Sequence, residues 1–195
     1  MDPASLDRAH AEVRRRLESV REDRWELPTP CEGRSVRDLV EHMAVGATMS
    51  RQVLAGEPWA RGAVVGEVLS ALDLKAEWEW RTAEERAGFA APGALGRTVA
   101  HRVMGDLLCA QFLGMRVGDA LLHAWDLARA VRADEELDPE LIAEVWARMS
   151  PIAGLDRQER LLRLGAERSS RRGRTTSDPA PRLGRASLIT PRAAA

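Results

Sequence analysis

Asp119, His123 and Asp126 are the residues of this 195-residue chain whose types and spacing point most directly to chemistry. They lie in the run GDALLHAWDLARAV, and at about 100° per residue they fall within roughly 60° of one another on a helix. The remaining circumference of that helix is almost entirely apolar, which is typical of a buried helix. Buried ionisable groups need a partner, so we expect Asp119 and His123 to share either a hydrogen bond or a metal ion.

Two interpretations of this pair stay open from the residues alone. Side chains at positions i and i+4 lie one above the other and can hold one ion together. An aspartate four residues before a histidine is also common as a simple hydrogen-bonded pair, and the isolated pair favours this interpretation. His42, at the edge of the apolar face of an earlier helix, is by itself best explained as a histidine bonded to a backbone carbonyl. Only together with Asp119 and His123 does it become a candidate third ligand.

The elements that must position these residues are helices. Apolar residues recur at three- and four-residue spacing, which predicts helices over residues 5–22, 35–54, 64–86, 118–131 and 138–149. Ser35 and Asp38 form a near-capping box at the start of the second helix. Residues 99–117 are ambiguous and could form a short strand or an irregular crossover. Four long helices with one long crossover before the last predict an all-α four-helix bundle, followed by an additional C-terminal helix.

Length and composition predict one globular domain with an appended tail. With 45% hydrophobic and 30% charged residues, the chain can bury one core, which we assign to residues 1–154. Residues 155–195 are rich in Arg, Ser and Pro without apolar periodicity, and we expect them to be disordered. A basic binding arm, an inert end and a shifted reading frame are three possible origins of this tail. Its lack of pattern favours the last two.

Charge and cysteine usage narrow the class of protein. The formal net charge is −1, but ten arginines against four acidic residues from Asp156 onward leave an acidic body, which argues against nucleic-acid binding. Cys31 and Cys109 offer no disulfide framework, which favours a reducing cytosol. No apolar run approaches 18 residues, and the first residues show no leader pattern. We therefore expect a soluble cytoplasmic protein that does not enter the membrane.

The segments LPTPCEGRSVRDLVEHM and GDALLHAWDLARAV resemble the two signature segments of the mycothiol-dependent maleylpyruvate isomerase N-terminal family. This family is a branch of the DinB-like metal-binding four-helix bundles that are common in actinobacteria, and the resemblance covers roughly residues 5–150. It implies that His42, Asp119 and His123 hold a divalent metal ion, most often zinc. It further implies a supporting or helix-pairing role for Asp126 and a packing role for Trp125.

The resemblance also implies a reaction. Two histidines and a carboxylate leave a tetrahedral zinc ion one open position, and family members are expected to place a low-molecular-weight thiol, mycothiol, on it. Metal coordination would convert this thiol into a nucleophilic thiolate. The expected function is a thiol-dependent transferase or isomerase, with a small-molecule thiol and an electrophilic substrate as partners. The alternative is a non-catalytic metal- or small-ligand-binding bundle, for which a homodimer is one option.

The chain departs from the family pattern at two points. Arg34 stands where the family commonly has a tryptophan. We also expect the further C-terminal domain of the isomerase to be missing, which argues against maleylpyruvate isomerase activity itself. Outside the ligand set, His101 is expected to be an incidental polar residue rather than a fourth ligand. Cys31 is expected to be a buried structural thiol rather than a pocket residue.

Overall fold

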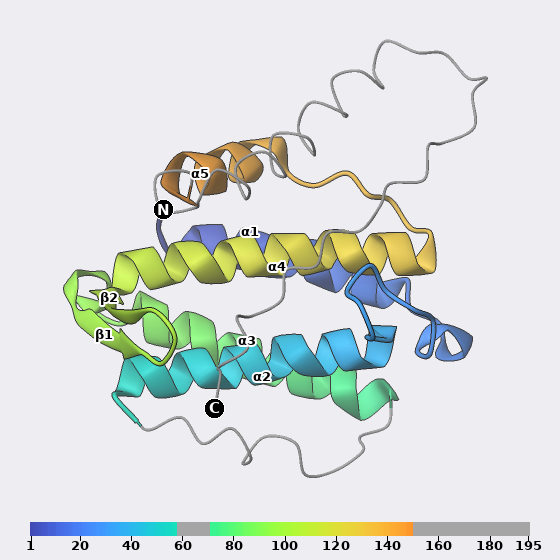
Figure 1. Cartoon of the computed structure of the whole chain (residues 1–195), viewed down its shortest axis with the longest axis horizontal. Coiled ribbons are helices and arrows are strands. Elements are labelled where there is room, and N and C mark those ends of the chain that lie inside the picture. The colour runs from blue at the N-terminus through green and yellow to red at the C-terminus, as the bar shows by residue number, and fades with distance from the viewer. Residues whose placement is uncertain (58–70, 150–195) are drawn as a thin grey trace, which may run out of the picture.

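Four long helices pack side by side in the computed structural model, which describes residues 1–57 and 71–149 (Figure 1). They are α1 (Pro3–Glu18), α2 (Val36–Ala55), α3 (Ala71–Ala90) and α4 (Cys109–Val131). Helix α1 packs against α4, and α2 packs against α3. A fifth helix, α5 (Pro139–Met149), packs on α4. The predicted all-α bundle with an additional C-terminal helix is therefore confirmed.

Local capping explains where the first two helices begin and end. The Asp2 side chain accepts a hydrogen bond from the Ser5 amide at the start of α1 (3.1 Å). Ser35 and Asp38 form a reciprocal capping box at the start of α2, as the sequence predicts. At the other end of α2, Gly56 has a φ of 71°. This left-handed conformation is common just past a helix C-terminus, and glycine adopts it without strain.

The long crossover between α3 and α4 contains an antiparallel hairpin. A short 3-10 helix precedes its two strands, and the elements in chain order are η2 (Ala94–Gly96), β1 (Thr98–His101) and β2 (Gly105–Leu108). The ambiguous residues 99–117 therefore divide between the hairpin and the first turns of α4. Helix α4 begins at Cys109 rather than at 118, because Phe112 and Leu113 bury a helical face in the core.

Two other predicted boundaries differ from the structure. Helix α1 ends at Glu18 rather than at 22, because a separate 3-10 helix, η1 (Glu22–Arg24), follows it. Helix α3 extends to Ala90 rather than to 86, because Phe89 is buried in the core. The predicted start of the third helix at 64, the domain boundary at 154 and the tail 155–195 lie outside the described residues. Within the described residues, no helix is both long enough and apolar enough to cross a membrane.

The bundle interior is apolar except for a group of ionisable side chains. Apolar residues from all four long helices form one core. Several ionisable side chains are buried among them: His10, Arg16, Glu85, Arg116, His123 and Asp126. Such groups are costly to bury unless they are paired. The contacts among these buried ionisable side chains therefore indicate where to look for a functional site.

Candidate metal centre

Helices α2 and α4 bring the three predicted ligands together. Each of His42, Asp119 and His123 offers one ligand atom, and these atoms all lie within 4.8 Å of one another. His123 Nε2 is 3.3 Å from Asp119 Oδ1, and the His42 and His123 rings meet edge to face with centroids 5.2 Å apart. Because zinc ligands lie about 2 Å from the ion, a single ion could contact all three after small side-chain shifts.

The other nitrogen of His123 is held by Asp126. His123 Nδ1 is 3.1 Å from Asp126 Oδ2, and Asp126 is itself buried. When Nδ1–H donates to this carboxylate, the Nε2 lone pair is left facing His42 and Asp119, which is the tautomer that a metal ligand needs. The Cys31 thiol donates to the same Asp126 oxygen over 3.1 Å. Asp126 is therefore placed to orient a candidate ligand.

An arginine holds Asp119 from its other side. Arg116 Nη1 donates to Asp119 Oδ2 over 2.7 Å, which leaves Oδ1 directed at His123. Arg116 Nε donates to Glu85 Oε1 on α3, also over 2.7 Å. Glu85 Oε2 lies 3.4 Å from His10 Nε2 on α1. Asp119, Arg116, Glu85 and His10 thus form a continuous row from the candidate centre across the bundle, which we call the buried polar line.

Gly46 on α2 leaves the space that Arg116 occupies. A Cβ atom at position 46 would lie 3.0 Å from Arg116 Nη1 and 3.1 Å from Nη2, closer than the optimal separation of non-bonded heavy atoms. Gly46 follows His42 by about one helical turn, so the same face of α2 presents the candidate ligand and the gap. A methyl group there would force the guanidinium, which also holds Asp119, to shift slightly.

The pKa values of the two histidines are shifted in opposite directions. Burial lowers the pKa of His42 to about 4, so its ring is neutral at pH 7. Burial would also lower the pKa of His123, but the charge of Asp119 and the hydrogen bonds to Asp119 and Asp126 outweigh it and raise this pKa well above 6.5. Burial opposes ionisation of Asp119, yet His123 and Arg116 hold the pKa of Asp119 well below 3.8. Before any metal binds, His123 therefore carries a proton that the ion must displace.

Cys31 lies against the candidate centre rather than in the core. It is half-buried and free, and its sulfur is 4.0 Å from His123 Nδ1 in addition to its bond to Asp126. The prediction that Cys31 is a buried structural thiol is therefore wrong. The loop before α2 is closed by a backbone hydrogen bond from Thr29 to Arg34, and this turn presents Cys31 to α4. Cys31, His123 and Asp126 form a second group of potential ligand atoms.

His101 and Trp125 have contacts of their own. His101 ends strand β1, and its Nδ1 accepts hydrogen bonds from the backbone amides of Val103 (3.3 Å) and Met104 (3.1 Å). It belongs to neither group of potential metal ligands in the described residues. The half-buried Trp125 ring packs under the Arg129 guanidinium, 4.9 Å from the ring centroid. These contacts are compatible with the predicted packing role of Trp125 and incidental role of His101, and both roles stay predictions.

Residues 6–128 match the family described as mycothiol maleylpyruvate isomerase N-terminal domain, a span that contains every residue of the candidate centre. The chain belongs to this family. The resemblance inferred from the two signature segments is therefore confirmed. The match reaches from α1 almost to the end of α4, so the family domain corresponds to the bundle itself.

Relatives of this chain include two uncharacterized proteins of Mycobacterium tuberculosis, from strains CDC 1551 / Oshkosh and H37Rv. Each is 34% identical over 157 residues, which are 79% of this chain and 81% of the relative. Crystal structures of the mycothiol-dependent maleylpyruvate isomerase and of its histidine-to-alanine mutant share the fold, with TM-scores of 0.61 and 0.63 at 20% and 19% identity. Each match covers 74% of this chain but only 66% of the solved chain. At this identity the likeness shows a shared fold alone.

Proposed function

We propose that this protein binds one divalent metal ion, with zinc preferred, through His42, Asp119 and His123. The observation that carries the proposal is that two helices bring these ligand atoms within 4.8 Å of one another, while the far nitrogen of His123 rests on the buried Asp126. Two histidines and one carboxylate suit zinc, and three protein ligands are typical of catalytic rather than structural zinc sites.

The proposed chemistry is thiol transfer or thiol-assisted isomerisation in the cytoplasm. A metal ion held by His42, Asp119 and His123 would lower the pKa of a coordinated thiol, and membership of a mycothiol-dependent family supports mycothiol as that thiol. The thiolate sulfur would add to one carbon of an activated double bond of the substrate, and the π electrons would move to the conjugated acceptor. In a transferase this adduct would take up a proton and keep the thiol. In an isomerase, rotation about the new single bond would be followed by elimination of the thiolate, which re-forms the double bond.

The residues around the centre would keep the ligands ready for this chemistry. Asp126 would hold the neutral His123 ring in the tautomer whose Nε2 can bind the ion, and Arg116 holds one oxygen of Asp119 so that the other is presented. Ligands that are fixed by outer hydrogen bonds lose little freedom when they bind a metal. Removing the residue that makes such a hydrogen bond typically weakens metal binding by about 10- to 100-fold.

A second candidate function is metal or small-ligand binding without catalysis. One observation favours it: each carboxylate at the centre already has a partner, Asp119 with Arg116 and Asp126 with His123 and Cys31. None of them is therefore an obvious general base among the described residues. The two functions differ in whether a thiol and a substrate bind and react.

Elemental analysis of the purified full chain tests the metal site. We expect about one zinc ion per chain in the wild type and little in His123→Ala, because one of three ligands is gone. His101→Ala is the matched control and should keep the metal. Equal metal in wild type and His123→Ala would refute the assignment. Calorimetry with mycothiol then separates the two functions, since zinc-dependent thiol binding supports the enzyme and its absence supports the non-catalytic binder.

A further inference from the structure

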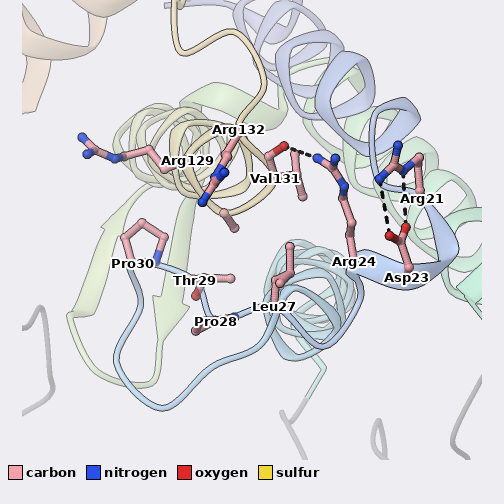
Figure 2. A pocket seen from close by; sticks show the side chains of 11 residues that line it. Arg21, Asp23, Arg24, Leu27, Pro28, Thr29, Pro30, Arg129, Val131 and Arg132 are labelled. Carbon is pink, nitrogen blue, oxygen red and sulfur yellow. Dashed lines mark hydrogen bonds and ion pairs between the residues drawn. The ribbon is translucent and has the colours of Figure 1, made fainter.

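A cavity of about 610 Å³ lies beyond the candidate centre, where the end of α4 meets the loop before α2 (Figure 2). Four arginines and a single carboxylate line it, together with the apolar and small residues of the loop and the helix end; the charged residues are Arg21, Arg24, Arg129, Arg132 and Asp23. In a chain with a formal net charge of −1, this is a local concentration of positive charge. Its lining is suited to an anion.

Three of the four guanidinium groups already have partners. Two of the partners, Asp23 and Val131, themselves line the cavity: Arg21 pairs with Asp23, Arg24 donates to the Val131 carbonyl, and Arg129 is 3.6 Å from Glu135. The bond from Arg24 also satisfies a carbonyl at the C-terminus of α4, which would otherwise repel an anion. These contacts hold three of the guanidinium groups at the cavity wall. Arg132 is the remaining one of the four.

Arg132 combines backbone strain with a side chain directed at the cavity. Its φ is 55°, and it is the one non-glycine residue at positive φ among residues 1–57 and 71–149. Glycine is usual at this position after a helix, because the left-handed conformation disfavours a Cβ atom. The guanidinium points toward the loop of Pro28 and Thr29 (Figure 2), and it makes no hydrogen bond or ion pair within the described residues. Residues with a strained backbone cluster at functional sites, so the conformation of Arg132 beside a cavity suggests a functional role.

The cavity continues the candidate metal centre along the same helix and the same loop. Ala130 lines the cavity and follows His123 by seven residues, about 10 Å along one face of α4. Pro30 also lines it, and the next residue, Cys31, bonds Asp126. The cavity thus lies next to the candidate centre on both α4 and the loop before α2.

We propose that this cavity binds the carboxylate or phosphate group of the substrate that the thiol attacks, with Arg132 as its main cation and Arg24 beside it. The assignment to the substrate rests on the proposed function, whereas anion binding by the cavity stands independently of the metal. The expected substrate is thus an electrophile that carries an anionic group at some distance from its reactive carbon.

Calorimetric titration of the full chain with inorganic phosphate and with succinate tests the cavity. In low-salt buffer, where charge attraction is least screened, Arg132→Gly should bind the tighter probe at least tenfold more weakly than the wild type. The same variant should melt about 2–4 °C higher, because glycine relieves the left-handed strain. The probe that binds more tightly tells whether the group is a phosphate or a carboxylate.

Two controls make the titration decisive. Arg51→Gln removes one positive charge from an exposed pair with Glu57 and should leave binding unchanged. Equal weakening in Arg51→Gln and Arg132→Gly would show general charge attraction and overturn the proposal. A lower Tm in Arg132→Gly with unchanged binding would show that Arg132 only caps α4, and would also overturn it.

A second measurement separates this proposal from the proposed function. His123→Ala should lose metal but still bind the tighter probe. In zinc- and mycothiol-loaded protein, mycothiol should displace bromide from an ω-bromoalkanoate faster than from the matching ω-bromoalkanamide, and Arg132→Gly should remove this preference. Acceleration of both reagents without a preference would overturn the substrate assignment. No acceleration of either, with probe binding intact, would instead refute the proposed function and confine the cavity to anion binding.

Discussion

Replacing Glu85 with glutamine should remove a negative charge from the middle of the buried polar line while keeping the shape of the side chain. Glu85 is fully buried, and its Oε1 accepts a 2.7 Å hydrogen bond from Arg116. Burial alone would raise the pKa of this carboxyl, but the Arg116 charge and the contact with His10 outweigh burial and lower the pKa from 4.5 to about 2. The ionised carboxylate therefore stabilises the folded state.

The magnitude follows from this pKa difference. At about 1.4 kcal/mol per tenfold change in a protonation equilibrium, a pKa lowered from 4.5 to about 2 corresponds to about 3 kcal/mol of folding free energy. Because the folded pKa lies below the unfolded one, this stability is fully present above pH 4.5. It is lost as the pH falls from there to about 2. Breaking a buried pair by removing one partner is typically of similar size, about 3–5 kcal/mol.

Urea unfolding at pH 7 and at a series of lower pH values measures the effect. Glu85→Gln should unfold with about 3 kcal/mol less free energy at pH 7, and the gap to the wild type should shrink as the pH falls below 4.5. Glu79→Gln is the matched control on the same helix, since Glu79 pairs with Arg14 at the partly exposed surface and should contribute about 1 kcal/mol at most. Equal losses in the two variants, or a gap that does not change with pH, would refute the reasoning.

Three further predictions concern the metal centre. Gly46→Ala should weaken zinc binding by about 10-fold or more, because displaced Arg116 no longer holds Asp119, and a zinc titration measures this loss. Asp126→Asn should weaken zinc binding by about 10- to 100-fold, because the amide cannot hold His123 in the same way as a carboxylate, again measured by titration. Zinc affinity should fall as the pH falls from 8 to 6, because protons compete for His123, whose pKa is raised by Asp119; titrations at both pH values measure the change.

Matched variants show whether these effects arise at the centre. Gly96→Ala adds a methyl group where nothing lies within 4 Å and should leave zinc affinity unchanged. Asp134→Asn removes an exposed carboxylate near Arg15 and should also be neutral. Unchanged affinity in Gly46→Ala would show that the Arg116 contact does not matter, and unchanged affinity in Asp126→Asn would show the same for the Asp126 contact. The same affinity at pH 6 and pH 8 would contradict ligation by histidine.

Features fixed by neighbours in the sequence were predictable. The Ser35 and Asp38 capping box places the start of α2 because its hydrogen bonds join residues three apart. Asp119 and His123 share a helix face because of helix geometry alone. The start of α4 at Cys109 was not predictable in this way, because an apolar stretch that follows a short hairpin fits both strand and helix.

The outer part of the site depends on packing and could be predicted only in part. Arg116 precedes Asp119 by three residues on one helix, so its pairing was within reach of sequence reasoning. Glu85 lies 31 residues from Arg116 and meets it only because α3 packs into the bundle. Cys31 reaches Asp126 across 95 residues, and the path of its loop decides this contact. No rule about residue spacing could predict contacts between residues so far apart in the sequence.

The lack of a side chain at Gly46 means that positions 46 and 116 should change together in evolution. Because any side chain at position 46 meets the guanidinium of Arg116, relatives that carry a larger residue there should carry something other than arginine at 116. Those that keep glycine should be free to keep the arginine. The two positions should therefore covary across the family, although 70 residues separate them. A relative that has exchanged both would need another way to hold the carboxylate at position 119.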